Sequence, residues 1–180
     1  MKYAPWILLP LLVGGWVLLF LFHQGYRFNA TPSMPRGIYQ LVRDSPVIDR
    51  GDLVSVCLEV EPFAALALER GYLRSGSYPC GLEPLLKIIA GMPGDSLDIN
   101  PNGILVNDQL QPESHVVSLD SRNRPMPVAL SLTPGVIPDG MALVLSDGRP
   151  GGFDGRYFGL VPLTSLQKVR PIRIFDPVGD

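Results

Sequence analysis

Residues 31–39 read Thr31-Pro-Ser-Met-Pro-Arg-Gly-Ile-Tyr39 and follow closely on an apolar N-terminal segment. Ser33 lies between Pro32 and Pro35, and prolines stiffen the backbone and disfavour a helix interior. The stretch therefore predicts a rigid loop that presents a serine hydroxyl, as a nucleophile requires. A structural turn is the competing interpretation, because turns rich in serine and proline are common. The rest of the sequence is needed to distinguish a nucleophilic serine from a structural turn.

The composition favours a β-rich domain. The chain has 180 residues, enough for one domain of ordinary size and an appendage. Glycine and proline contribute 19 residues each, well above their usual combined share of about 12%. This favours short antiparallel strands joined by turns, with one or two short helices, over a helical bundle. The net charge is −2 with 18% charged residues, so nucleic acid is not an expected partner.

An uncharged segment lies near the N-terminus. Residues 6–22 contain no charged side chain and would form a helix about 25 Å long, near the lower limit for spanning a bilayer. A cleaved signal peptide is the alternative, but Lys2 alone precedes the segment as a charged side chain and no Ala-x-Ala site follows it. We therefore expect a membrane anchor over residues 1–28, with one transmembrane helix at about 6–22, and a mainly β domain over residues 29–180.

Apolar runs and turn residues predict the elements of this domain. The expected strands are 37–41, 53–58, 85–90, 96–99, 104–106, 141–145 and 168–175, and the expected helix is 61–73. Asn107-Asp108 is an expected hairpin turn. Residues 112–138 are polar and rich in proline, which predicts a long connection with at most two short strands.

Lys87 lies between two apolar pairs, Leu85-Leu86 and Ile88-Ile89. Enclosure by apolar neighbours disfavours the charged amine and lowers its pKa. A general base near neutral pH needs a pKa of about 7–8 instead of about 10.4, a difference of roughly 4 kcal/mol. A serine paired with such a neutral amine is a known variant of the Ser-His-Asp arrangement. The alternative is a lysine on an edge strand that guards against aggregation.

Other catalytic designs have less support. His23 lies at the end of the apolar segment and His115 lies in a polar loop, and neither His-Glu-x-x-His nor Gly-x-Ser-x-Gly occurs. We expect no metal and no cofactor. Cys57 and Cys80 are too few and too far apart for a zinc ribbon. They would form a disulfide in an oxidising compartment and remain two buried thiols in the cytosol.

The order of these motifs resembles the type I signal peptidases. The motifs are an N-terminal anchor, Ser-Met-Pro at 33–35, Gly-Asp-Leu-Val at 51–54, Lys-Ile-Ile-Ala-Gly-Met-Pro-Gly-Asp at 87–95, and the block from Ser146 to Pro162. The resemblance covers nearly the whole chain, and residues 87–95 and 154–162 carry it most specifically. It implies a signal-peptidase-like β domain of short antiparallel strands. It also implies a single-pass protein of the bacterial inner membrane with a periplasmic catalytic domain, an orientation that Arg27, Arg36 and Arg43 alone leave open.

The resemblance also implies roles for individual residues. Ser33 matches the nucleophile and Lys87 the general base, while the Thr31 hydroxyl and the Ser33 backbone N–H match the groups that bind the oxyanion. The residues that match the supporting block are Asp147, Arg149, Asp154 and Arg156.

Two departures from the family pattern point to a subgroup. Pro35 directly follows Met34, and the small hydroxyl residue expected two positions before Asp154 is replaced by Gly152. The second departure leaves open what orients Lys87, with Asp154 or a water molecule as candidates. These changes are similar to the TraF-type peptidases, which process pilin subunits for conjugative transfer and link cleavage to cyclisation.

The expected activity is therefore acyl transfer by a membrane-anchored serine endopeptidase. Lys87 would accept the Ser33 proton, and the acyl-enzyme would react with water or with a peptide amine. The expected partners are a membrane-inserted pilin-like precursor and the lipid bilayer, with other components of the transfer apparatus as further candidates. A general signal peptidase for secreted proteins and a non-catalytic scaffold of a secretion apparatus are the alternatives.

Overall fold

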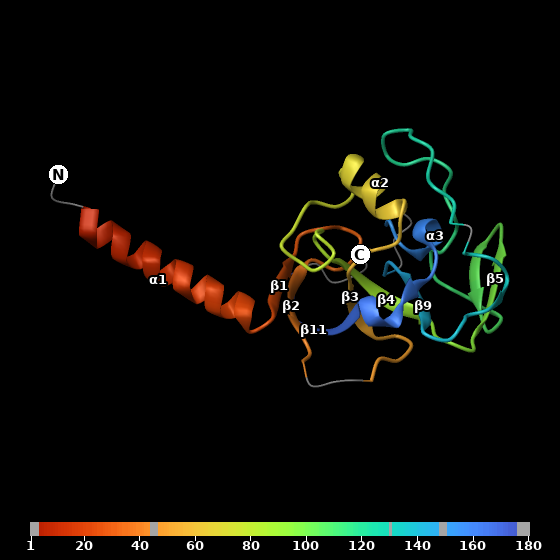
Figure 1. Cartoon of the computed structure of the whole chain (residues 1–180), viewed down its shortest axis with the longest axis horizontal. Helices are drawn as coiled ribbons and strands as arrows, with labels where there is room; N and C mark the ends of the chain where they lie inside the picture. The colour runs from red at the N-terminus through yellow and green to blue at the C-terminus, as the bar shows by residue number, and fades with distance from the viewer. Residues whose placement is uncertain (1–3, 44–46, 130, 148–150, 176–180) are drawn as a thin grey trace.

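The computed structural model describes residues 4–43, 47–129, 131–147 and 151–175. Helix α1 (Ala4–His23) projects away from a β domain that contains the rest of these residues (Figure 1). Within the described ranges, no helix combines the length and the apolar character that crossing a membrane requires. The transmembrane helix expected at about 6–22 is thus not shown by the structure. The mainly β fold expected for the domain is confirmed.

A seven-stranded sheet forms the larger layer of the domain, with all neighbouring strands antiparallel. Its strands in spatial order are β1 (Tyr26–Asn29), β2 (Gly37–Leu41), β11 (Leu166–Ile174), β3 (Leu53–Val56), β4 (Leu85–Gly91), β9 (Met141–Leu145) and β10 (Val161–Pro162). The chain therefore returns at its C-terminal end to lie between its earliest strands, and β4 lies in the interior of the sheet between β3 and β9.

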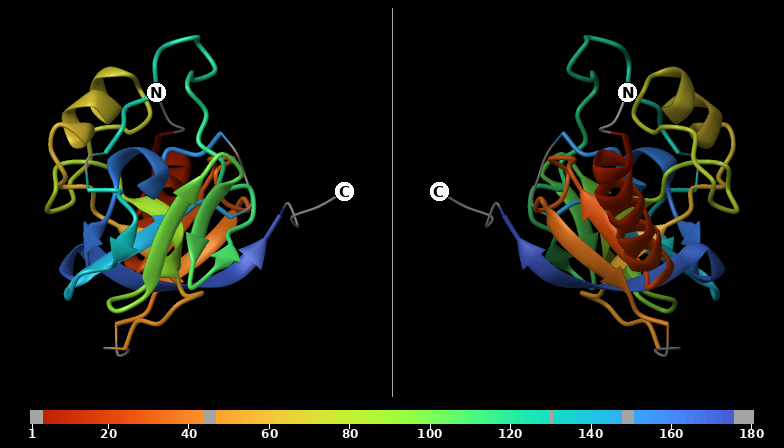
Figure 2. Two further views of the ribbon diagram at one scale, coloured as in Figure 1. Left: turned by 90° about the vertical axis from the view of Figure 1, so that its right-hand side faces the viewer. Right: turned by 90° about the vertical axis from the view of Figure 1, so that its left-hand side faces the viewer.

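A four-stranded sheet lies to one side of the larger one (Figure 2). Its strands in spatial order are β7 (Gln109–Leu110), β6 (Gly103–Val106), β5 (Ser96–Asn100) and β8 (Gly135–Val136). Asn107 and Asp108 have φ values of 50° and 61°, the left-handed conformation that a two-residue hairpin turn favours. The predicted hairpin turn is confirmed, and it joins β6 to β7.

The helices of the domain are short. Helix α2 (Phe63–Glu69) occupies the middle of the segment predicted as a helix, and Gly71 follows it with φ at 72°. Helix α3 (Gly155–Phe158) was not expected from the sequence. It begins at Asp154, whose side chain accepts a hydrogen bond from the backbone N–H of Arg156. A 3-10 turn, η1 (Leu163–Ser165), leads into β11.

Two apolar clusters hold the layers together. The larger cluster packs α2 and α3 against β3, β4 and β9, with Val54, Val144 and Phe158 completely buried. The smaller cluster joins the four-stranded sheet to β4 and β9 through Ile104, Leu143 and neighbouring side chains. A disulfide between Cys57 and Cys80 ties the end of β3 to the loop after α2.

Candidate active site

Lys87 is completely buried on the interior strand β4. Its neighbour in register on β3 is Val54, and β9 flanks the other side of β4. The alternative of an edge-strand lysine is therefore wrong. The Lys87 amine donates a hydrogen bond to Ser146 Oγ at 3.1 Å.

Burial lowers the pKa of the Lys87 amine to about 8, from an ordinary value of 10.5. The Asp154 carboxylate opposes this shift by attraction, and the Arg156 guanidinium adds to it by repulsion. A substantial fraction of the amine is therefore neutral near pH 8. This lysine has the protonation behaviour that a general base requires.

Asp154 and Arg156 form a buried ion pair beside Lys87. Arg156 Nε lies 2.8 Å from Asp154 Oδ1, and its Nη2 lies 2.8 Å from Oδ2. Asp154 Oδ2 also accepts the backbone N–H of Ser146 at 2.9 Å. The guanidinium donates further to the carbonyl oxygens of Gly152, Glu113 and His115. The pair therefore fastens the end of β9, the start of α3 and a distant loop to one another.

The Ser33 loop is held by Asn29, the last residue of β1. Asn29 Nδ2 donates to the carbonyl oxygens of Thr31, Met34 and Pro35 at 3.1–3.2 Å. Its Oδ1 accepts hydrogen bonds from the backbone N–H and the hydroxyl of Thr31. Thr31 Oγ1 lies 3.3 Å from Ser33 Oγ. Asn29 was not predicted as a site residue, although an asparagine whose side chain bonds a backbone N–H two residues later is a common turn-forming arrangement.

Met34 joins this loop to the loop that follows β9. The Met34 side chain is buried, and its Sδ accepts the backbone N–H of Asp147 at 3.3 Å. Asp147 directly follows Ser146, so the serine loop and the partner of Lys87 belong to adjoining segments. Ser33 is partly exposed, and within the described ranges no hydrogen bond joins it directly to Lys87. Arg149, expected in the supporting block, lies outside the described residues.

Ser146 supplies the hydroxyl group next to Lys87 that Gly152 lacks. Asp154 and a water molecule were the candidate partners of the Lys87 amine, and the structure places the hydroxyl of Ser146 in contact with it. Both oxygens of Asp154 are engaged by Arg156 and by backbone N–H groups. The sequence analysis named Ser146 only as the start of a motif, because its approach to Lys87 depends on the pairing of β4 with β9.

The competing catalytic groups lie elsewhere. His115 is partly exposed, and its Nδ1 lies 3.9 Å from the Glu113 carboxylate. In the part of the chain that the structure covers, no group of three or more His, Cys, Asp and Glu side chains could hold a metal ion.

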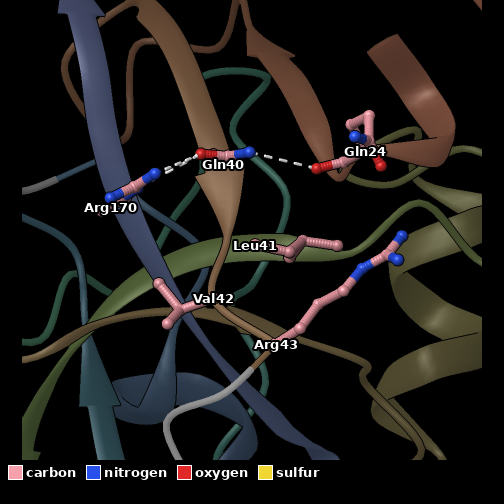
Figure 3. Close-up of a pocket in the computed structure, with 6 residues that line it drawn as sticks. All are labelled: Gln24, Gln40, Leu41, Val42, Arg43 and Arg170. Carbon is pink, nitrogen blue, oxygen red and sulfur yellow. Dashed lines mark hydrogen bonds between the residues drawn. The ribbon is translucent and has the colours of Figure 1, made fainter. Parts of the chain in front are cut away.

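A cavity of about 300 Å³ lies where α1 meets the large sheet (Figure 3). The residues that line it are Gln24, Gln40, Leu41, Val42, Arg43 and Arg170. Gln40 accepts a hydrogen bond from Arg170 and donates one to the carbonyl oxygen of Gln24. This cavity contains none of the candidate catalytic residues, and its contacts fasten the end of α1 to β2 and β11.

The match to a known family places this chain among the serine-type hydrolases. The chain belongs to the signal peptidase family, peptidase S26, whose model matches residues 1–172. It is 36% identical over 154 residues to the conjugal transfer protein TraF of Agrobacterium fabrum (strain C58 / ATCC 33970), covering 85% of each chain. It is 31% identical over 167 residues to a plasmid transfer protein TraF of Escherichia coli, covering 89% of this chain and 90% of that one. A crystal structure of a signal peptidase I from Enterococcus faecalis V583 matches 69% of this chain and 97% of its own, with 21% identity and a TM-score of 0.41.

Proposed function

We propose that this protein is a serine endopeptidase in which Ser33 is the nucleophile and Lys87 the general base. The observation that carries the proposal is the complete burial of Lys87 beside a hydroxyl group, with a pKa of about 8. A buried cationic amine without a function is costly, because burial disfavours its charge. The Met34–Asp147 contact supports a site shared by the serine loop and the lysine.

The proposed reaction begins with proton transfer from Ser33 Oγ to neutral Lys87 while Oγ attacks the scissile carbonyl. The oxyanion then accepts hydrogen bonds from the Ser33 N–H and the Thr31 hydroxyl. The Lys87 ammonium protonates the departing amine, and an ester joins the substrate to Ser33. Water or a peptide amine next attacks this ester, which yields either a hydrolysed or a newly joined peptide.

The resting hydrogen bonds require two changes for this reaction. The Thr31 hydroxyl donates to Asn29 at 2.7 Å, so it has to turn toward the oxyanion. Ser33 Oγ has to turn from Thr31 toward the Lys87 amine. Such tightening of catalytic hydrogen bonds on substrate binding is common.

The ion pair beside Lys87 affects the pKa of this proposed base in two opposite ways. Asp154 and Arg156 are both buried and neutralise each other. Asp154 raises the pKa of Lys87 and Arg156 lowers it, and burial is the largest of the three effects.

The proposed substrate is a membrane-inserted pilin-like precursor for conjugative transfer, and cyclisation of the product is part of the proposal. The names of the relatives from Agrobacterium fabrum and Escherichia coli support the link with transfer. Large apolar side chains along α1, among them Leu12, Trp16 and Phe20, are exposed and would be covered by lipid. Ser33 follows the end of α1 by ten residues. We propose that α1 holds the protein at the bacterial inner membrane, with the β domain on the periplasmic side.

Co-expression with two precursors tests this function. The full chain is combined with the candidate pilin from its own transfer system and with an ordinary secretory precursor, and intact masses of the products are measured. Processing of the pilin alone is expected, with a cyclic product lighter by one water molecule than the linear one. Equal cleavage of both precursors would instead indicate a general signal peptidase, which the family match also allows.

Matched variants separate catalysis from a scaffold role. Ser33→Ala and Lys87→Arg are both expected to abolish processing, because a guanidinium keeps its proton at working pH. Ser165→Ala is the control, since the Ser165 hydroxyl donates to the nearby carbonyl oxygen of Pro162 and not to a candidate catalytic residue. Transfer of the plasmid supported by Ser33→Ala at the wild-type level would contradict the enzymatic proposal and favour a scaffold.

A further inference from the structure

Ser146 and Gly152 compete for one space next to Lys87. A Cβ atom built on Gly152 would lie 1.9 Å from Ser146 Oγ and 2.7 Å from Ser146 Cβ. Both distances are below 3.0 Å, which real Cβ contacts essentially never reach. Gly152 is absent from the glycines with positive φ, so its backbone would accept another residue. Glycine is therefore required at 152 by the Ser146 side chain and not by the backbone.

We propose that Ser146 is the positioning residue of Lys87, and that positions 146 and 152 are interchangeable sources of a single hydroxyl group. The side chain at 146 occupies the space, and glycine at 152 leaves it open. Moving the serine to 152 and the glycine to 146 should place a hydroxyl beside the same amine.

The surroundings of Ser146 suit a positioning role. Its side chain is nearly buried, and its backbone N–H is fixed by Asp154 Oδ2 at 2.9 Å. Because Asp154 is itself paired with Arg156, these contacts hold the backbone of Ser146 and so limit the movement of its hydroxyl group. Its oxygen can accept an N–H from Lys87 whether the amine is charged or neutral. This hydrogen bond restricts the rotation of the amine and leaves the lone pair of the neutral form free to accept a proton.

Few other groups can substitute for this hydroxyl. The charged groups that act on the amine are Asp154 and Arg156, which are paired with each other. On the flanking strands, β3 places Val54 opposite Lys87, and β9 consists of apolar residues. A variant without the Ser146 hydroxyl therefore leaves the buried ammonium without its acceptor.

The titration of Lys87 tests the proposal without any substrate. The chain has three lysines, Lys2, Lys87 and Lys168, so ¹⁵N-lysine NMR of the full chain in detergent gives three Nζ signals, assigned with Lys87→Arg. Ser146→Ala is expected to lower the Lys87 pKa by about one pH unit or more, the size of a lost hydrogen bond to a charged group. Ser114→Ala is the matched control, because Ser114 is equally buried but bonds to Ile104 and Gln111.

The reciprocal exchange is the sharper test. Gly152→Ser alone should clash and lose processing, and Ser146→Gly alone should lower processing at least tenfold. The double variant Ser146→Gly/Gly152→Ser should recover both the Lys87 pKa and most of the processing rate. If Ser146→Ala does not fold, Ser146→Cys keeps the volume while weakening the acceptor.

Two results would overturn the proposal. One is an unchanged Lys87 titration in the variant without the hydroxyl, and the other is a double variant that performs no better than Ser146→Gly. The processing measurement rests on the proposed function, whereas the NMR titration does not. A wild type that cleaves neither precursor but shows the expected titration shifts would therefore contradict the proposed function alone.

Discussion

Asn29 Oδ1 lies 2.7 Å from Thr31 Oγ1 and accepts its hydrogen bond. The same side-chain amide donates to three carbonyl oxygens of the loop, at Thr31, Met34 and Pro35. One residue of β1 therefore shapes the backbone on both sides of Ser33. Two prolines stiffen this loop, and the hydrogen bonds of the Asn29 side-chain amide fix its conformation.

Asn29→Ala is expected to lower the processing rate by ten- to a hundredfold, because the loop loses five hydrogen bonds. The measurement is the initial rate of precursor cleavage, with folding checked by circular dichroism. Asn100→Ala provides the control, since the Asn100 side chain accepts the turn N–H of Asn102 in the four-stranded sheet. A rate within twofold of the wild type would show that the prolines suffice.

Thr31→Val is expected to lower the acylation rate by about 10²–10³-fold, the usual effect of losing one oxyanion donor. Valine has the shape of threonine without its hydroxyl, and Thr31→Ser restores the donor. Rapid-quench detection of the acyl-enzyme separates this step from substrate binding. Full activity in Thr31→Val would remove Thr31 from the oxyanion site.

The pH dependence of cleavage should follow the Lys87 amine. Since the neutral form is the base, kcat/KM should rise with pH and level off above about 8, the pKa of Lys87. The measurement is kcat/KM from pH 5.5 to 9.5. A profile that levels off near pH 6 would assign the base to another group.

Lys87→Met should stabilise the protein near pH 7. Below pH 8 the amine is charged in both the folded and the unfolded chain, so the folded state carries the full cost of burying it. The cost declines as pH rises from about 8 to 10.5, because only the unfolded chain then holds the proton. The difference between the pKa of Lys87 in the folded protein, about 8, and its ordinary value of 10.5 corresponds to about 3 kcal/mol.

Urea unfolding at pH 7 and pH 10 measures this effect. The gain from Lys87→Met should be large at pH 7 and small at pH 10. Lys168→Met is the comparison, because Lys168 is partly exposed and paired with Asp52. Equal gains at both pH values would mean that folding does not lower the pKa of Lys87.

Asp154→Asn should destabilise the protein by about 3–5 kcal/mol, because it leaves the buried Arg156 guanidinium without its counter-charge. The midpoint of urea unfolding measures the loss. Asp120→Asn is a useful comparison, since Asp120 also pairs with an arginine, Arg124, that is partly exposed. A smaller loss at Asp154 than at Asp120 would contradict the role of the buried pair.

Much of the β domain could be predicted from local patterns. The strands β2 and β9 match their predicted bounds, and the Asn107-Asp108 turn follows from residues that tolerate positive φ. No bounds were predicted for β1, β7, β8 and β10, although the hairpin turn implied a strand after Asp108 and short strands were expected within residues 112–138. The strands without predicted bounds are two to four residues long, and only pairing with distant strands stabilises them.

The amino-acid sequence by itself determined the family, the candidate serine and lysine, and the mainly β character of the domain. These three properties depend on local residue types and on motifs whose residues are contiguous in the sequence, so the sequence is sufficient to predict them. Only the tertiary structure decided that β4 is an interior strand, that Ser146 holds the Lys87 amine, and that Asn29 holds the Ser33 loop. These contacts depend on strand order and register, which arise when residues as far apart as 87 and 146 pack together.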